Sequence, residues 1–248
     1  MLTESGRRNF AENCKTYMSG KIITFANQKG GVGKSTLCTL FANYLVDKGK
    51  DVMILDCDPQ QSIYKRRQYE MNNLKGFKAP YRVDASGLEN AKNVERLMEN
   101  LRNIGRISLV DTPSGLTFEG RVALLKNSDW IIVPFQYELS VAMSTSGFLA
   151  WISNESGLGS DYWKRVILVP NRIQAGAGNS MEREKIEQFR EKLQQIVTFA
   201  PQIDQRKDIE RTKTVMLSSI QHRLLDEVFD FIYDKIMSNP TTTISENE

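Results

Sequence analysis

The amino-acid sequence predicts a doubly wound α/β fold, in which helices flank a mostly parallel β-sheet. Five runs are almost continuously apolar, as in parallel strands buried on both faces, and they occupy residues 22–26, 52–55, 107–110, 131–133 and 166–169. Amphipathic helical patterns lie between these runs. Strands that alternate with helices are typical of parallel sheets, whose ligands bind at the carboxyl ends of the strands.

Length and composition fit one ordinary globular domain. The chain has 248 residues, of which 40% are hydrophobic and 25% charged, and its net charge of +3 is only weakly basic. Its three cysteines are an odd number without C-x-x-C spacing, which favours a reducing compartment, interpreted here as a bacterial-type cytoplasm. No run approaches the roughly 18 apolar residues of a membrane span. We expect residues 1–20 to form a mobile arm, because they are polar and lack periodicity.

The first apolar run leads into a glycine-rich turn and then into a helical pattern. Gly30, Gly31 and Gly33 allow the backbone to turn its N–H groups toward an anion, and the following helix directs its positive end to the same place. Lys34 is then expected to reach the β- and γ-phosphates of a nucleotide, and the Ser35 hydroxyl to bind Mg²⁺. The predicted phosphate-binding residues are Gln28, Lys29, Gly30, Gly31, Val32, Gly33, Lys34, Ser35 and Thr36.

Two positions depart from the strict G-x-x-x-x-G-K-[ST] pattern. Gln28 occupies the first glycine position, and a second lysine, Lys29, lies within the loop. In both respects the loop resembles the deviant Walker A motif of the ParA/MinD superfamily of P-loop NTPases, and Asn27-Gln28 resembles its ParA branch. The resemblance implies ATP as the nucleotide and catalytic roles for both lysines. It also implies an ATP-sandwich homodimer in which Lys29 reaches the partner subunit's nucleotide.

Apolar residues at helical spacing run from Leu37 to Leu45, and Gly49 is the expected C-terminal cap of this helix. Two aspartates follow the second apolar run, at 52–55. Asp56 and Asp58 are two positions apart, so both carboxylates point toward the same side of the strand end. Asp-Cys-Asp-Pro-Gln resembles the superfamily's Walker A′ motif. By that resemblance, Asp58 orients or activates the attacking water, and Asp56 lies in the outer shell of the Mg²⁺. An ordinary Asp-Pro turn is the alternative.

A basic run and a capping pattern come next. Residues 62–78 contain one acid, Glu70, and the basic residues Lys65, Arg66, Arg67, Lys75 and Lys78. This run is either a solvated helix face or a contact surface for DNA or an acidic partner. Ser86 and Glu89 fit a capping box for a helix that begins near Ala91.

The third motif is the apolar run that ends at Asp111. Together with Thr-Pro-Ser-Gly115 it resembles Walker B followed by switch II. The resemblance implies that Asp111 holds a Mg²⁺-bound water and that Gly115 lets the loop respond to the γ-phosphate.

The last apolar run ends at Asn171, where the superfamily often places its adenine-binding residue. An amide offers the donor and the acceptor that an adenine edge requires, and an exposed loop residue is the alternative. Residues 200–210 resemble the segment after the last parallel strand, with a modest basic cluster at Arg206, Lys207, Arg211 and Lys213. The final amphipathic pattern, 217–236, has an acidic polar side, which favours core packing over a membrane anchor.

The resemblance covers residues 21–237, predicted to form one P-loop ATPase domain before a disordered tail at 238–248. It implies a short ParA-like ATPase whose nucleotide state switches dimerisation and non-specific binding to double-stranded DNA. Such a protein would position a plasmid or mobile element at the nucleoid, without a membrane, and a ParB-like or other cargo adaptor would stimulate its slow hydrolysis. The alternatives are a metabolic ATP-dependent ligase and a MinD-like membrane-cycling scaffold. A nitrogenase-type iron protein would need cysteines after Cys57, and there are none.

Overall fold

The computed structural model describes residues 20–88, 90–114, 120–155, 160–174, 176 and 179–238. Most of the expected arm (1–20) and tail (238–248) therefore lies outside the described residues, as do Glu89 and Gly115. The proposed division into an arm, one domain and a tail stays a prediction.

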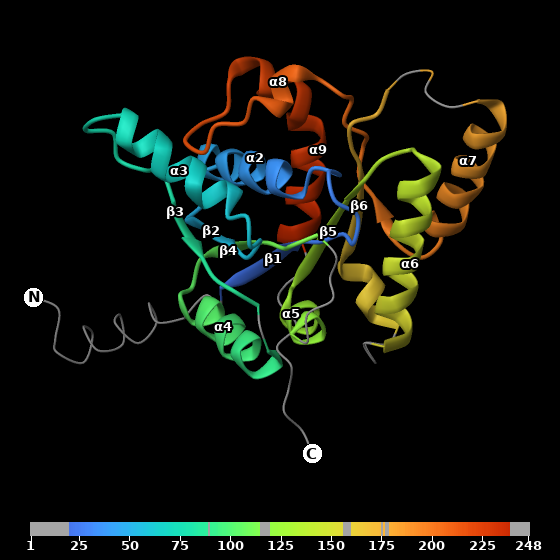
Figure 1. Ribbon diagram of the computed structural model, residues 1–248, viewed down its shortest axis with the longest axis horizontal. Helices are drawn as coiled ribbons and strands as arrows, with labels where there is room; N and C mark the ends of the chain where they lie inside the picture. Colours follow the sequence, from blue (N-terminus) through green and yellow to red (C-terminus); the bar gives the residue numbers. More distant parts are fainter. Residues whose placement is uncertain are drawn as a thin grey trace, which may run out of the picture.

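The described residues form a seven-stranded sheet in which every neighbouring pair is parallel. The strand order is β3-β2-β4-β1-β5-β6-β7, and the predicted α/β fold is confirmed (Figure 1). The strands are β1 (Lys21–Phe25), β2 (Val52–Asp56), β3 (Arg82–Ala85), β4 (Ile107–Asp111), β5 (Trp130–Phe135), β6 (Val166–Pro170) and β7 (Thr198–Phe199). The chain leaves β1 toward one edge of the sheet and leaves β5 toward the other, which opens a crevice between their carboxyl ends.

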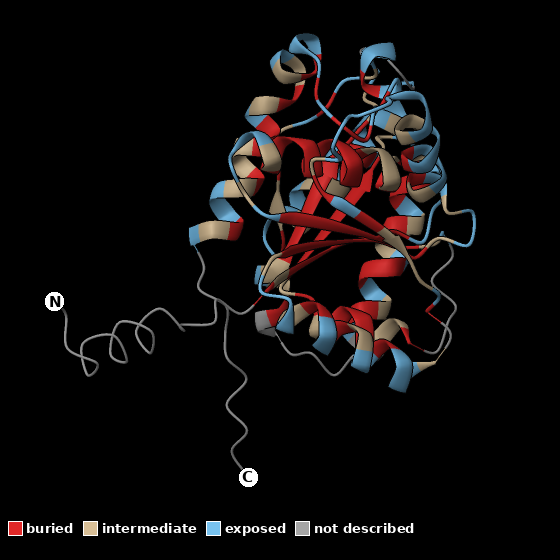
Figure 2. Ribbon diagram, turned by 90° about the vertical axis from the view of Figure 1, so that its left-hand side faces the viewer, coloured by how far each residue is buried: buried red, intermediate tan, exposed pale blue. Residues whose placement is uncertain are grey.

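Helices cover both faces of the sheet. One face carries α2 (Lys34–Asp47), α3 (Ser62–Asn73), α8 (Lys207–Glu210) and α9 (Ser219–Ser238). The opposite face carries α4 (Ala91–Asn103), α5 (Arg121–Asn127), α6 (Leu139–Glu155) and α7 (Ser180–Gln194), and the 3₁₀ helix η1 (Ser160–Arg165) precedes β6. Because successive strand residues point to opposite faces, Ile23 packs under α2 while Ile22 packs against α4. The buried strands and inner helix faces form a continuous layer in Figure 2.

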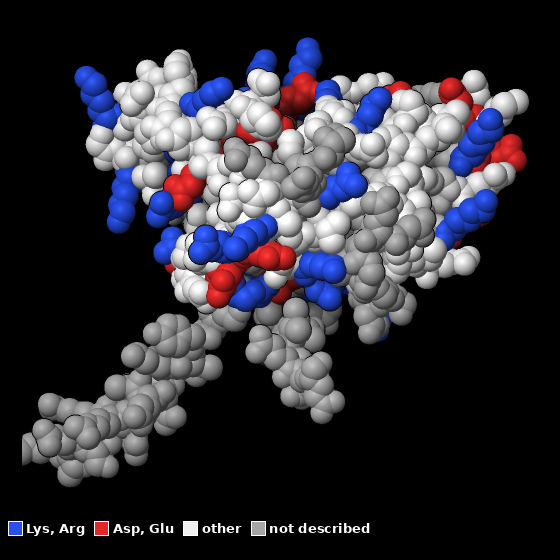
Figure 3. Space-filling view, turned by 60° about the horizontal axis from the view of Figure 1, so that its bottom comes forward, with Lys and Arg blue, Asp and Glu red and all other residues white. Residues whose placement is uncertain are grey.

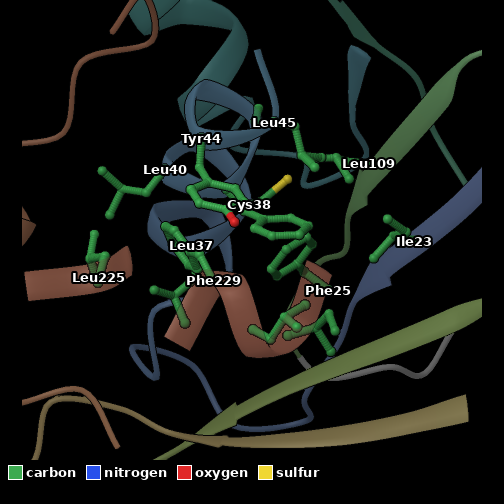
Figure 4. Close-up of a cluster of buried hydrophobic side chains, with 14 of the residues drawn as sticks. Ile23, Phe25, Leu37, Cys38, Leu40, Tyr44, Leu45, Leu109, Leu225 and Phe229 are labelled. Carbon is green, nitrogen blue, oxygen red and sulfur yellow. The ribbon is translucent and has the colours of Figure 1, made fainter. Parts of the chain in front are cut away.

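Several aromatic side chains pack together among aliphatic ones in the core between α2 and α9 (Figure 4). The ring of Phe41 stacks on Tyr44 with centroids 5.8 Å apart and meets Phe229 edge-on at 5.3 Å. Buried apolar residues of α9 include Leu225, Val228, Phe229, Ile232 and Ile236, so core packing of the last helix is confirmed. Ile220 is an exception, since it is exposed at the start of α9.

The helix ends partly follow the sequence pattern. Gly49 has a φ of +71° just after α2, and its N–H donates to Val46 O at 2.8 Å, which confirms the expected cap. The capping residue expected for α4 is wrong, because Asn90, and not Ser86, accepts from Asn93 N at 2.9 Å. Asn90 directly precedes the first helical residue, so its side chain reaches the free N–H groups of the first turn.

Candidate functional site

The loop between β1 and α2 is anchored by one buried amide. Asn27 Nδ2 donates to Pro134 O at 2.8 Å and to Thr145 Oγ1 at 3.1 Å, while Asn27 Oδ1 accepts from Lys29 N at 3.1 Å. This side chain therefore ties the loop to the end of β5 and to α6. The phosphate loop (residues 27–36) consequently leaves the sheet at the crevice beside β5.

Glycine is required at the end of the phosphate loop. Gly31 and Gly33 have φ angles of +79° and +100°, in the left-handed region that side chains disfavour. At Gly33 a Cβ atom would also lie 2.3 Å from Asn171 Nδ2, too close for any side chain. The glycine pattern in the sequence thus reflects both backbone conformation and close packing.

Two side chains that directly follow β6 (Val166–Pro170) hold the back of the phosphate loop. Asn171 Nδ2 donates to Val32 O at 2.8 Å, and Arg172 Nη1 donates to Gly31 O at 3.0 Å. In a trans peptide the N–H points opposite to the carbonyl, so the N–H groups of Val32 and Gly33 face away from these side chains. Such an array of N–H groups at the start of a helix is an anion-binding arrangement.

The ammonium group of Lys34 lies on the floor of this arrangement. Lys34 is 5% exposed, and its Nζ donates to Lys29 O at 3.3 Å and to Ser114 Oγ at 3.1 Å. Burial lowers the pKa of Lys34, while the charges of Asp111 and Asp58 raise it. A buried cation that contacts two neutral oxygens is placed to bind a phosphate strongly.

Asp111 is a buried carboxylate whose oxygens make no hydrogen bond of good geometry among the described residues. It ends β4 beside Phe25 of β1 and Asp56 of β2, and its side chain is fully buried. Burial raises the pKa of Asp111 to about 7, although nearby Ser35 and Lys34 lower it. Ser35 lies close enough to affect this pKa, yet neither oxygen of Asp111 makes a hydrogen bond of good geometry within the described part of the chain.

This orphaned carboxylate beside a helix N-terminal hydroxyl fits a Mg²⁺ site that includes phosphate oxygens. Mg²⁺ usually binds through one or two protein oxygens, waters and substrate phosphates, and rarely in a cage of protein ligands. Accordingly, no group of three or more His, Cys, Asp or Glu side chains suited to a metal occurs among the described residues. Ser35 and Asp111 offer two such protein oxygens close together.

Asp56 has a structural contact that the sequence did not indicate. Its Oδ2 accepts from Ile63 N at 2.9 Å and from Tyr64 N at 3.0 Å, and its Oδ1 accepts from Asp58 N at 3.2 Å. Asp56 therefore caps the N-terminus of α3. Its expected place in the outer shell of the Mg²⁺ stays a prediction, because both carboxylate oxygens already bind backbone N–H groups.

A cleft of about 320 Å³ brings several of the predicted residues together. Its wall includes Gly31, Gly33, Lys34, Ser35, Thr36, Asp58 and Asn171, together with Ser114, Arg172 and part of the segment 204–210. Gln28 and Lys29 are exposed on the outer side of the phosphate loop, whereas Val32, Asp56 and Asp111 are buried behind the wall.

Two residues of this wall were not expected from the sequence. Arg172 has a left-handed φ of +57° and donates to both Gly31 O and Glu210 Oε1, so it links the phosphate loop to α8. Ser114 contacts Lys34, and its place three residues after Asp111 was the only available signal. No sequence pattern indicated the role of Arg172.

A family model and curated relatives match this chain. Residues 23–233 match the family model described as the CobQ/CobB/MinD/ParA nucleotide binding domain. The chain is 32% identical over 149 residues to the chromosome-partitioning ATPase Soj of Thermus thermophilus. This match covers 52% of this chain and 59% of Soj. The chain spans about half the length of the curated relatives that it matches.

Solved structures share the fold at low sequence identity. A putative plasmid partition protein from Borrelia burgdorferi bound to AMPPNP superposes with a TM-score of 0.64 at 19% identity, covering 88% of this chain and 99% of that one. The pNOB8 ParA bound to nonspecific DNA superposes with a TM-score of 0.55 at 16% identity, covering 88% and 98%.

Proposed function

The chain belongs to the CobQ/CobB/MinD/ParA nucleotide-binding domain family, and from this premise we propose that it is a Mg²⁺-dependent ATPase of the partition type. One observation carries the proposal. The N–H groups of the phosphate loop and the buried ammonium of Lys34 converge on one cleft, where they would bind the phosphates of ATP. Asp111 lies behind that cleft, as a Mg²⁺ site requires.

The residues of the cleft divide the work of hydrolysis. Lys34 would neutralise the β- and γ-phosphates, and Ser35 and Asp111 would hold Mg²⁺, which would supply charge neutralisation to the phosphates when bound. Asp58, half-buried in the wall, orients or activates the attacking water. The Oδ1 atom of Asn171 has no partner in the described structure and would accept from the adenine amino group.

Nucleotide state would control assembly. Lys29 is exposed at the rim, where it reaches the nucleotide of a second copy in an ATP-sandwich dimer. The dimer binds double-stranded DNA without sequence preference and positions a plasmid or mobile element at the nucleoid in the cytoplasm. Soj is by name a chromosome-partitioning ATPase, and the structure of pNOB8 ParA on nonspecific DNA supports this partner. A ParB-like or other cargo adaptor accelerates slow hydrolysis.

A second candidate function rests on another cleft. It has a volume of about 740 Å³, shares Arg172 and Gln205 with the nucleotide cleft, and is lined further by Tyr137, Glu138 and Arg183. A metabolic ligase would bind its substrate there. ATP turnover that depends on a small metabolite, and is indifferent to DNA, would favour this candidate.

For a membrane-cycling scaffold, the relevant test is sedimentation with liposomes in the presence of ATP. None of the helices in the described ranges combines the length and apolarity of a membrane span. Because surface binding needs no span, co-sedimentation would be the outcome that supports this alternative.

The primary experiment is isothermal titration of ATP and Mg²⁺ into the protein and into Lys34→Ala. The variant should lose measurable binding, because the phosphate charge is then uncompensated. Lys126→Ala is the matched control, since Lys126 is exposed on α5, on the opposite face of the sheet. Unchanged ATP affinity and turnover in Lys34→Ala would refute the proposed site.

A further inference from the structure

Two basic stretches that lie far apart in the sequence are joined in the fold. Arg66 of α3 donates from Nη1 to Thr212 O at 2.8 Å, across 146 positions of sequence. The next residue, Arg67, donates from Nε to Thr214 Oγ1 at 2.7 Å. Helix α3 therefore lies directly against the segment that follows α8, on the same side of the sheet (Figure 1).

The contact also decides which charges of α3 remain outside. Arg67 is 3% exposed, so it belongs to the interior and cannot be part of a contact surface or a solvated face. Glu70, the single acid of residues 62–78, accepts from Thr214 N at 2.9 Å and so turns inward. The outward side of α3 next to this contact therefore presents Lys65 and Arg66 without a neighbouring carboxylate of their own helix.

The segment 204–213 alone has little net charge. It contains four basic residues, all exposed, and three exposed acidic ones, Asp204, Asp208 and Glu210. Asp204 lies 3.6 Å from Arg206, and Glu210 pairs with Arg172 at 2.9 Å. Positive charge sufficient for a polyanion appears only when Lys65 and Arg66 are added to this segment.

We propose that Lys65 and Arg66 form one DNA-binding surface with the segment 206–213, against which the backbone of a DNA duplex lies. We call this the joint surface, and its members are Lys65, Arg66, Arg206, Lys207, Arg211 and Lys213. The inference rests on the proposed function, since it assigns the surface for the proposed DNA partner. The buried contacts of Arg67 and Glu70 with Thr214 hold its two halves in register.

Duplex DNA suits this surface better than a protein partner does. Protein interfaces depend on buried apolar or aromatic anchors. Among the described residues, no exposed large apolar side chain falls within 62–67 or 204–213; Tyr69 on α3 and Met216 are exposed beside these stretches, one residue each, and do not form an apolar cluster within the surface. Phosphate groups require only cations at the right spacing, and such contacts are independent of sequence.

The test is fluorescence anisotropy of a labelled short duplex with the full chain and a slowly hydrolysed ATP analogue, over a range of salt. Lys65→Glu with Arg66→Glu should weaken binding by about tenfold or more and reduce the salt slope by about 2, because two phosphate contacts are lost. Lys207→Glu with Lys213→Glu should have a similar effect. Lys92→Glu with Arg96→Glu is the control, since both residues are exposed on α4, on the opposite face.

The α4 variant controls for the loss of two exposed basic residues as such. On the side of the molecule that carries α4, basic and acidic side chains are mixed (Figure 3). Equal behaviour of the α3 double variant and the α4 control would overturn the inference and leave the proposed function standing. Failure of the unaltered protein to bind DNA in any nucleotide state would instead reject the DNA partner.

The single variant Lys65→Glu keeps the Arg66–Thr212 contact. It should still weaken DNA binding several-fold while ATP affinity stays unchanged. An unchanged DNA affinity in this variant would count against the inference.

Discussion

Arg67 and Thr214 form a buried contact between α3 and the segment before α9. Arg67 donates to the Thr214 hydroxyl at 2.7 Å and also to its carbonyl oxygen, while its remaining guanidinium nitrogen donates to Tyr81 O. Burial lowers the pKa of Arg67, and the ring of Tyr81 lies 4.3 Å below the guanidinium carbon. Arg67 belongs to the basic run 62–78, which could be read from the sequence as solvent-exposed, but its side chain packs in the interior and joins α3 to Thr214 and Tyr81.

Arg67→Met should destabilise the protein by about 3 kcal/mol, because at least two buried acceptors lose their donor. Urea unfolding measures this as a lower midpoint. Lys65→Met, two residues away on the exposed side of α3, should change the free energy of unfolding by less than about 0.5 kcal/mol. Equal midpoints for the two variants would show that the buried network contributes little.

Asp58→Ala should bind ATP like the parent and hydrolyse it about 100-fold more slowly or worse, since the proposed role of the carboxylate is to act on water and not on the nucleotide. Its Oδ1 accepts from Gln60 N at 2.8 Å, which holds the side chain at the cleft wall. Phosphate release under saturating ATP is the measurement. Asp51→Ala, an exposed acid before β2, is the control, and parental turnover in Asp58→Ala would remove Asp58 from the mechanism.

Lys29→Ala should bind ATP as a monomer, because in the proposed dimer the Lys29 side chain, and not its backbone, would reach the nucleotide of the second copy. The loop should survive the change, since Lys29 contributes its backbone N–H to Asn27 and its carbonyl to Lys34. Light scattering with an ATP analogue, on an Asp58→Ala background, reports the dimer. Lys126→Ala on the same background controls for charge, and a Lys29 variant that dimerises equally well would exclude the role in the partner's site.

Asp111→Asn should make the nucleotide-free protein more stable at high pH. The folded-state pKa of about 7 exceeds the unfolded value near 4, so the folded state binds more protons and the parent loses stability as pH rises through this range. The asparagine variant lacks that titration, so its stability relative to the parent should grow from near zero at about pH 4 to about 4 kcal/mol above about pH 7. Thermal unfolding across pH measures it; a difference independent of pH would contradict the burial of the charged form.

Asn171→Ala distinguishes two contributions of one amide. Loss of the bond from Nδ2 to Val32 O should weaken ATP and inorganic tripolyphosphate alike, whereas loss of an adenine contact through Oδ1 should weaken ATP further. Competition binding with both ligands should therefore show about tenfold greater loss for ATP. Equal losses would leave Asn171 as a support of the phosphate loop only.

Local patterns in the sequence were sufficient for five of the seven strands, for the glycine-rich turn between β1 and α2, and for the aspartates at the ends of β2 and β4. Runs such as 131–133 are apolar because both faces of a parallel strand are buried, and Gly33 is glycine because its φ is +100°. Strands β3 and β7 escaped prediction because one alternates polar and apolar residues at the sheet edge and the other has two residues. Neither has enough local signal of its own.

The tertiary structure alone decided the contacts between distant parts of the chain. Arg67 lies in the interior, and the Asp56 carboxylate accepts hydrogen bonds from backbone N–H groups at the start of α3. Asn171 and Arg172 donate to carbonyl oxygens of the phosphate loop. The local sequence around a charged residue in a helix does not distinguish a side chain exposed to solvent from one that donates to a buried carbonyl oxygen. The choice depends on which backbone atoms other elements bring within hydrogen-bond distance, and packing across the whole sheet determines that.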